Sequence, residues 1–176
     1  IFVASIAFLF ISMPSEAIYV NVVSSALAGA ILGFIPYNIS NKRKIFLGDS
    51  GSLFAGFLIS IISLGVGYSN NNPVAVYVPV LILSVPIFDT IYVSLMRIKS
   101  GISPFKGTKD HFALRFENMG FERKKIVFLT FIFSTFVSFL SYLITRVNLE
   151  ISILLYGIVI LFFIFVARVI SNVKIN

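Results

Sequence analysis

Residues 42–52 read Lys-Arg-Lys-Ile-Phe-Leu-Gly-Asp-Ser-Gly-Ser, and this stretch decides how the rest of the chain is interpreted. Three consecutive cations lead into a glycine-punctuated loop, and a long apolar run follows directly. Asp49 stands at the junction. A carboxylate at the start of a membrane helix is energetically costly, and ionisable groups near the bilayer are functional by default. The stretch therefore predicts a membrane protein with a site around Asp49.

The overall composition also indicates a membrane protein. The chain has 176 residues, of which 58% are hydrophobic and 12% are charged. Soluble domains carry about 25% charged residues, so this composition excludes an ordinary soluble enzyme. The chain contains no cysteine, which excludes disulfides and thiolate metal sites. We expect the lipid bilayer as its surroundings and no nucleic-acid partner.

The apolar segments predict an all-α integral membrane protein, since a membrane-spanning helix needs roughly 17–25 apolar residues. We expect five full spans, at residues 17–37, 52–68, 74–96, 126–145 and 151–170, and one partial span at residues 1–13. Pro79 and Pro86 fall inside the third full span. They predict a kink there, because each proline removes a backbone hydrogen bond.

Small residues recur every four positions in the first full span, at Ser25, Gly29 and Gly33. Such a stripe is typical of helices that pack closely in membranes. We therefore expect a neighbouring helix to contact this face.

Residues 1–176 are expected to form a single transmembrane domain. The first residue is Ile1, and no charged residue precedes the first apolar run, so the start of a signal peptide is absent. The simplest interpretation is that the chain is a fragment cut inside a longer membrane protein.

Two polar loops join the spans, at residues 38–51 and 97–125. Every Lys and Arg except Arg146 lies in these loops or near the C-terminal end, which the alternation of spans places on one side of the membrane. The positive-inside rule makes that side cytoplasmic. Asp49, Asp89 and the single histidine, His111, fall on the same side. Groups able to act as acid, base or metal ligand therefore gather with the cations.

Asp49 has two interpretations from the residues alone. A helix beginning near Ser50 would put its positive end at the carboxylate, and Asp49 would be its N-cap. Alternatively, Asp49 binds Mg²⁺, which favours one or two carboxylates together with substrate phosphates, and Gly48 and Gly51 let the backbone approach a phosphate. Gly-Asp-Ser-Gly also surrounds the nucleophile of trypsin-like proteases, but their soluble β-barrel fold is excluded here.

Asp89 lies near the cytoplasmic end of the kinked span, three residues after Pro86. It either makes a helix–helix hydrogen bond or a salt bridge to Arg97, or it has a functional role, as ionisable groups within spans do by default. Both interpretations stay open at this point.

The second polar loop predicts a short helix. Thr108 or Asp110 would be its N-cap, and Gly120 would end it. His111 and Arg115 would then be i, i+4 neighbours on one face. A paired His and Arg suits an anion such as a diphosphate. Alternatively, the basic loop rests on anionic lipid headgroups.

Three stretches, in this order, carry a family resemblance. Residues 45–52 are similar to a Phe-Met-Gly-Asp-x-Gly-Ser region, residues 86–90 to a Pro-x-x-Asp-Thr motif, and residues 103–120 to a cytoplasmic histidine loop. Together they resemble the polyprenyl-phosphate N-acetylhexosamine-1-phosphate transferases (glycosyltransferase family 4), which include phospho-N-acetylmuramoyl-pentapeptide transferase and the WecA- and TagO-like enzymes.

The resemblance implies a membrane transferase. It would move a sugar 1-phosphate, N-acetylhexosamine 1-phosphate, from a UDP-sugar to polyprenyl (undecaprenyl) phosphate at the cytoplasmic face and release UMP, in cell-wall or surface-polysaccharide synthesis. Asp49 would bind Mg²⁺ and, with His111, be catalytic. The implied substrate-binding residues are Asn38, Lys44, Gly48, Ser50, Gly51, Lys109, Asp110 and Arg115. A homodimer is the family expectation.

The sequence also departs from the family pattern. The usual His-x-His-His of the loop reads His-Phe-Ala-Leu at residues 111–114, although residues 109–115 are similar to a variant ending Lys-Asp-His-x-x-x-Arg. The family's Asp-Asp and Asn-x-x-Asp-Gly motifs belong upstream of Ile1. We therefore expect the C-terminal half of a transferase, inactive by itself. The alternative is a non-catalytic lipid-binding or transporter-like membrane protein, although a transporter would hold its polar groups near the bilayer midplane.

Overall fold

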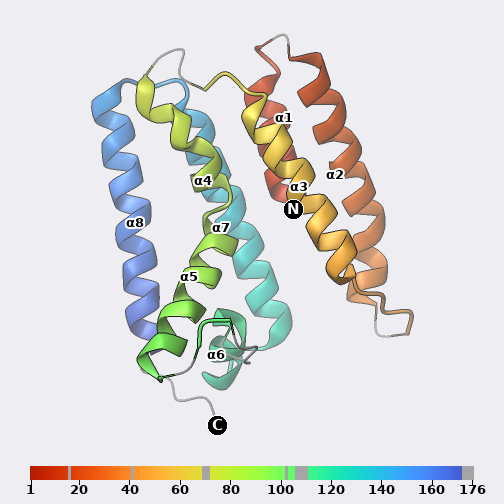
Figure 1. Ribbon diagram of the computed structural model, residues 1–176, viewed down its shortest axis with the longest axis vertical. Coiled ribbons are helices and arrows are strands. Elements are labelled where there is room, and N and C mark those ends of the chain that lie inside the picture. Colours follow the sequence, from red (N-terminus) through yellow and green to blue (C-terminus); the bar gives the residue numbers. More distant parts are fainter. Residues whose placement is uncertain (16, 41, 69–71, 102, 106–110, 172–176) are drawn as a thin grey trace.

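The structure is a computed structural model, and it describes residues 1–15, 17–40, 42–68, 72–101, 103–105 and 111–171. The described residues form helices and contain no strand, which confirms the predicted all-α class (Figure 1). The elements are α1 (Phe2–Ser12), α2 (Ile18–Ile39), α3 (Gly48–Leu64), the 3-10 helix η1 (Pro73–Tyr77), α4 (Val78–Ile82), α5 (Ser84–Lys99), α6 (Phe112–Asn118), α7 (Arg123–Ile144) and α8 (Leu149–Ser171).

Among the described residues, three single helices are long and apolar enough to cross a membrane: α2, α7 and α8. They correspond to three of the five predicted full spans. Helix α3 has 17 residues, at the short limit of about 17 for a spanning helix, and it begins at Gly48 and ends at Leu64, four residues before the prediction at each end. The 11-residue α1 corresponds to the predicted partial span.

The third predicted span is broken at Leu83, where η1 and α4 meet α5 at an angle of 71°. Pro86 lies in the first turn of α5 and has no N–H to donate to the Ile82 carbonyl, against which its ring would also clash. On either side, Leu83 N–H donates to the Pro79 carbonyl at 3.0 Å and Ile87 N–H donates to the Leu83 carbonyl at 3.1 Å. The predicted kink is confirmed, and Pro86 accounts for its position.

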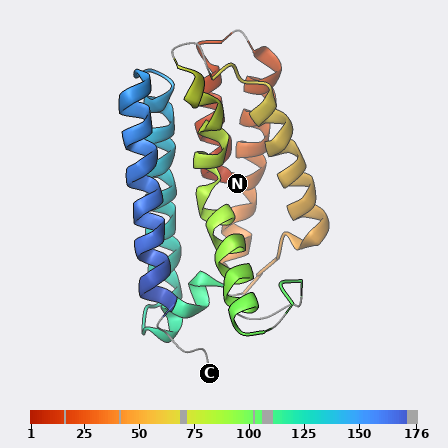
Figure 2. The ribbon, with the colours of Figure 1, turned by 60° about the vertical axis from the view of Figure 1, so that its left-hand side comes forward.

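The helices pack into a bundle in which α7 joins the N-terminal and C-terminal helices. Helix α7 contacts α1, α4 and α8, and Figure 2 shows the bent α4–α5 segment between the α7–α8 pair and α3. The main core is built from side chains of most helices, such as Phe8 of α1, Val20 of α2, Ile62 of α3 and Ile144 of α7. In a bilayer, close van der Waals packing rather than exclusion of water stabilises such a core.

The small-residue stripe on α2 does not pack as predicted. Ser25, Gly29 and Gly33 are exposed, and nothing would lie within 4 Å of a Cβ added to either glycine. The buried face of α2 includes Ser24 and Ala28 instead, one position before the first two members of the stripe. One position is a rotation of about 100° on a helix, so the stripe faces away from the packed side.

A second, smaller apolar cluster supports α6. Tyr92 and Val93 of α5 and Ile170 of α8 are buried in it, and Phe112 and Phe116 of α6 pack against them. This cluster holds the short helix α6 against the ends of α5 and α8.

Both polar loops lie at the same end of the molecule. In Figure 1, α2, α5 and α8 end at the lower end, where α6 also lies, while α1, α3 and α7 end at the upper end. The described parts of the two cation-rich loops are therefore close to one end of the bundle, as the alternation of the predicted spans requires.

Candidate functional site

The loop between α2 and α3 is organised by two polar side chains. Asn38 Nδ2 donates to the Ile45 carbonyl at 3.0 Å. Ser40 Oγ accepts hydrogen bonds from the backbone N–H groups of Lys42 and Arg43, at 3.3 and 3.1 Å. Asn38, which the resemblance assigns to substrate binding, thus closes the loop that carries the three cations.

Asp49 lies in the first turn of α3 and is exposed. The helix begins at Gly48, with Leu47 as its N-cap residue and no side-chain capping bond. The interpretation of Asp49 as the N-cap of a helix beginning near Ser50 is therefore wrong. Gly48 has a φ of +68°, a left-handed conformation that glycine adopts readily, and the helix begins there. Within the first turn, the helix dipole still favours an anion.

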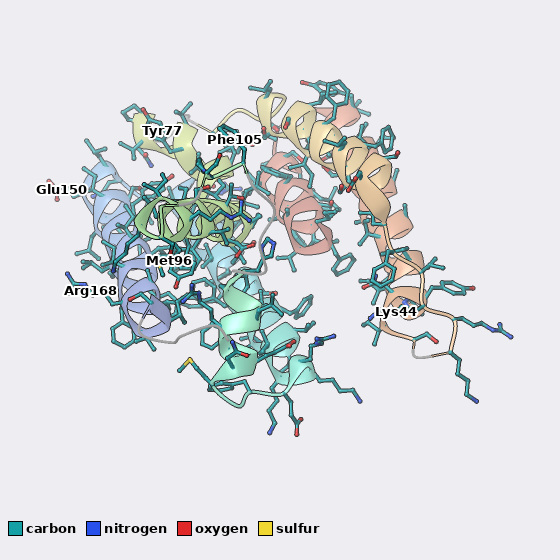
Figure 3. The ribbon with its side chains drawn as sticks, turned by 60° about the horizontal axis from the view of Figure 1, so that its bottom comes forward. Lys44, Tyr77, Met96, Phe105, Glu150 and Arg168 are labelled. Carbon is teal, nitrogen blue, oxygen red and sulfur yellow. The ribbon has the colours of Figure 1, made fainter. Side chains whose placement is uncertain are left out.

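The remaining predicted residues of this loop surround Asp49 along the chain. Ser50 is exposed beside it. Gly51 has a packing role, because a Cβ at this position would come within 2.8 Å of Leu47 Cγ. Lys44 Nζ lies 5.2 Å from the centre of the Phe46 ring, at a margin of the molecule (Figure 3). The loop therefore presents a carboxylate, a hydroxyl and cations on an exposed surface.

The polar loop of residues 38–51 contains one carboxylate that could bind a metal ion. Among the described residues, no group of three or more His, Cys, Asp or Glu could hold a metal. Asp49 is the only acid of the loop. Because Mg²⁺ commonly takes one or two carboxylates and completes its shell with phosphate oxygens and water, Asp49 fits as a single ligand and not as part of a complete protein cage.

Asp89 of α5 holds the start of α6. Its Oδ2 lies 2.7 Å from His111 Nδ1, and its Oδ1 accepts the Phe112 N–H at 3.0 Å. His111 is the N-cap residue of α6, so the prediction of Thr108 or Asp110 at that position is wrong. The group that caps this helix comes from a different helix, because the side chain of Asp89 supplies the acceptor.

The end of α6 at Gly120 is confirmed. Gly120 has a φ of +90°, its N–H donates to the Glu117 carbonyl at 2.9 Å, and Phe121 N–H donates to the Phe116 carbonyl at 3.1 Å. These two bonds form a Schellman motif, and the rings of Phe116 and Phe121 lie 5.7 Å apart. Glu117 also binds Arg123 with both oxygens, at 2.5 and 3.1 Å, which ties α6 to α7.

Arg115 points toward the packed interior. It is 5% exposed, its Nη1 donates to the Ile170 carbonyl at 3.3 Å, and its guanidinium carbon lies 5.4 Å from the centre of the Tyr92 ring. Both His111 and Arg115 reach α5, as a common face of α6 predicts, but only His111 is exposed. Arg115 joins α5, α6 and α8, and its role in binding an anion stays a prediction.

A pocket of about 490 Å³ lies between α3 and α5. Ser52 of α3 and Thr90 of α5 contribute its hydroxyl groups. Ser52 is three residues after Asp49 and donates to the Asp49 carbonyl at 3.0 Å, whereas Thr90 follows Asp89 directly. The helix that carries Asp49 and the helix that carries Asp89 therefore border one pocket.

A larger groove of about 880 Å³ follows the bent α4–α5 segment and α8. Its walls are apolar almost throughout, from Tyr77 and Val80 near η1 to Tyr92, Leu95 and Ala167 near α6. Tyr92 lines the groove, and the Arg115 guanidinium lies over its ring. A long apolar chain is the kind of ligand that this lining would accept.

The structure brings only some of the predicted site residues together. Lys109 and Asp110 lie outside the described residues. The structure joins His111 to Asp89 and leaves Asp49 apart from them, in the first turn of α3. The partner of Asp89 could not be read from the sequence, whose only signal was an acid near the end of a kinked span.

Fold and site together define an all-α membrane protein with two polar loops at one end. An exposed aspartate follows the first loop at the start of α3, and His111 of the second loop pairs with Asp89 of α5. Comparison with known proteins gives the family. Residues 1–67 match the model of glycosyl transferase family 4. No solved structure matches the chain.

Curated relatives agree with that match. A probable undecaprenyl-phosphate N-acetylglucosaminyl 1-phosphate transferase of Bacillus subtilis (strain 168) is 31% identical over 146 residues, which are 83% of this chain and 40% of that protein. A decaprenyl-phosphate N-acetylglucosaminephosphotransferase of Mycobacterium leprae (strain TN) is 31% identical over 129 residues, 67% of this chain and 32% of that protein. An undecaprenyl-phosphate alpha-N-acetylglucosaminyl 1-phosphate transferase of Escherichia coli (strain K12) is 28% identical over 109 residues, 60% of this chain and 30% of that protein.

These matches confirm the predicted family: the chain is a relative of the polyprenyl-phosphate N-acetylglucosamine-1-phosphate transferases of glycosyl transferase family 4. The aligned part of the chain spans 40% of the length of the Bacillus subtilis relative.

Proposed function

We propose that the protein transfers N-acetylhexosamine 1-phosphate from a UDP-sugar to a polyprenyl phosphate at the cytoplasmic membrane face and releases UMP. The observation that carries the proposal is that α3, whose first turn holds Asp49, begins toward the end of the molecule where α6 lies (Figure 1), and that His111 at the start of α6 pairs with Asp89. The names of the relatives support it, since they describe N-acetylglucosamine phosphate transfer to undecaprenyl or decaprenyl phosphate.

The residues of the α2–α3 loop suit the donor phosphates. Phosphoryl transfer depends mainly on positioning and charge neutralisation. Lys44 and its two neighbouring cations attract the diphosphate, and the N-terminal end of α3 favours negative charge. Asp49 would hold Mg²⁺, which when bound neutralises phosphate charge. His111, exposed on the other loop, would contact the nucleotide-sugar.

The apolar groove along α8 supports a lipid acceptor. An isoprenoid chain carries no polar groups, and the groove walls are apolar almost throughout. A chain lying in this groove would place its phosphate at the end where α6 and the cationic loops lie. In this way the acceptor phosphate reaches the polar site while the isoprenoid chain stays in the bilayer.

The test is an assay of transfer in membranes that contain the native protein, with labelled UDP-N-acetylglucosamine and undecaprenyl phosphate. Asp49→Asn at saturating Mg²⁺ should lower UMP release on the order of 100-fold or more, as does removal of other groups that stabilise transition-state charge. Glu150→Gln makes the same change at an exposed acid in the first turn of α8, at the opposite end, and should not alter the rate. Wild-type rates for Asp49→Asn would contradict its role, and no transfer by the wild type would contradict the function.

A further inference from the structure

Both carboxylate oxygens of Asp89 are engaged by α6. Oδ2 lies 2.7 Å from His111 Nδ1, and Oδ1 accepts the Phe112 N–H at 3.0 Å. The Asp89 side chain is 21% exposed and the His111 side chain is 56% exposed. The carboxylate is thus partly covered and bound to protein groups, while the imidazole that it holds is open to a ligand.

We propose that Asp89 is a positioning residue that orients His111 so that Nε2 meets the nucleotide-sugar; this inference rests on the proposed function. An ionised carboxylate only accepts hydrogen bonds, so the His111 Nδ1 opposite it carries a proton. A hydrogen bond at one ring nitrogen decides which nitrogen remains for chemistry. With Nδ1 directed at Asp89, Nε2 is the nitrogen presented to the substrate.

Two pairs of contacts hold α6 on α5, so the direction of the His111 ring can change while α6 stays in place. Asp89 and Tyr92 lie one turn apart on α5, and they contact His111 and Arg115, which are one turn apart on α6. Phe116 of α6 also packs against the cluster around Tyr92. Removing the charge of Asp89 therefore leaves α6 docked by its second turn, and the expected effect is on the direction of the His111 ring.

Two variants of Asp89 and one control variant test the two bonds of its carboxylate. Asp89→Asn keeps an oxygen for the Phe112 N–H but takes the carboxylate away from His111. Asp89→Ala removes both acceptors and should also destabilise α6. Glu117→Gln is the matched control, because it makes the same carboxylate-to-amide change on α6 at a residue that bonds Arg123 and not His111.

We expect Asp89→Asn to lower kcat/KM for the UDP-sugar roughly 10- to 100-fold, by analogy with the loss of a carboxylate that orients a metal-binding histidine. Glu117→Gln should keep the wild-type value. In a His111→Ala background, Asp89→Asn should cause no further loss, because residues that act as a unit are not additive. If Asp89 only stabilised the fold, Asp89→Asn would lower kcat/KM by the same factor in the wild type and in the His111→Ala background.

Imidazole ¹⁵N NMR of the native protein provides a readout that does not depend on activity. His111 is the only histidine of the chain, and the His111→Ala spectrum identifies its signals. We expect a protonated Nδ1 in the wild type and loss of that preference in Asp89→Asn. An unchanged Nδ1 signal would overturn the proposal, as would an equal rate loss in both backgrounds or wild-type kcat/KM for Asp89→Asn. Absence of transfer by the wild type would overturn the proposed function instead, and the Nδ1 signal would still decide the role of Asp89.

Discussion

Three acids at the polar-loop end differ in their neighbours, and these neighbours decide what each acid can do. Asp49 is exposed and makes no capping bond. Asp89 bonds His111 and the start of α6 with its two oxygens. Glu117 binds Arg123 with both oxygens. Of these three, Asp49 is the acid whose oxygens lie open to a metal ion or a substrate.

Glu117 gives a prediction about pH. The hydrogen bonds from Arg123 lower the pKa of the Glu117 carboxyl, and the opposite charge of Arg123 adds to the effect. A carboxyl whose folded-state pKa is lowered contributes stability above the ordinary glutamate pKa of about 4.3. That contribution disappears as the pH falls through the lowered folded-state pKa. The difference in free energy of unfolding between the wild type and Glu117→Gln should therefore shrink below that ordinary pKa.

Chemical denaturation at a series of pH values measures this difference. The effect should be small and should weaken with added salt, because the Arg123 side chain is 74% exposed and surface ion pairs are screened. A difference that grows as the pH falls would contradict the assignment of the Glu117–Arg123 pair.

Among the elements, α6 shows how a short helix depends on its surroundings. It has seven residues, whereas isolated helices shorter than about 12–15 residues are marginal in water. Asp89 caps its start, the Schellman motif at Gly120 closes its end, and Phe112 and Phe116 anchor it on the apolar cluster. Its position is thus decided by α5, α7 and α8 rather than by its own sequence.

A buried amide joins three other elements at the opposite end. Asn72 is 3% exposed, and its Nδ2 donates to the carbonyls of Ile144 and Val147, both at 2.9 Å, and to Ser152 Oγ at 3.2 Å. Its Oδ1 accepts the Ala75 N–H at 2.9 Å. One side chain therefore connects the start of η1 with the end of α7 and the start of α8.

Asn72→Ala should destabilise the protein. Leaving a buried carbonyl without its donor costs roughly 1–3 kcal/mol, and Asn72 serves the carbonyls of both Ile144 and Val147. Asn148→Ala is the matched control, because Asn148 is exposed and its side-chain Oδ1 accepts the Ile151 N–H at the start of α8; loss of such a helix-start acceptor costs about 1 kcal/mol. Unfolding in detergent measures both, and an equal loss for the two variants would contradict the role of Asn72.

The whole molecule has one end that carries the polar loops, and its orientation in the membrane can be tested directly. Residues 1–176 contain no cysteine, so each single cysteine introduced there is compared with the unsubstituted protein as the background. The positive-inside rule predicts that a membrane-impermeant maleimide labels Arg146→Cys in intact cells and labels Lys44→Cys only after permeabilisation. Labelling of Lys44→Cys in intact cells would reverse the orientation. Arg146 lies between α7 and α8 at the opposite end and serves as the control.

The sequence by itself determined the features that depend on composition and local spacing. Apolar run length predicted the all-α membrane class, the alternation of the predicted spans placed both loops at one end, and Gly120 predicted the end of α6. Pro79 and Pro86 predicted the kink, because the loss of a proline N–H acts within a single turn. Local motifs also identified Asp49 and His111 as candidates and led to the family that the comparisons confirm.

Only the tertiary structure decided which side chains meet. The Asp89–His111 bond joins residues 22 positions apart, the contact of Arg115 with Ile170 spans 55 positions, and the outward direction of the Ser25 stripe depends on where α1 lies. No local periodicity specifies such pairs, because each results from how separate helices pack in three dimensions. The sequence could therefore name the acids and the histidine, and the packing of α6 onto α5 assigned one of those acids to the histidine.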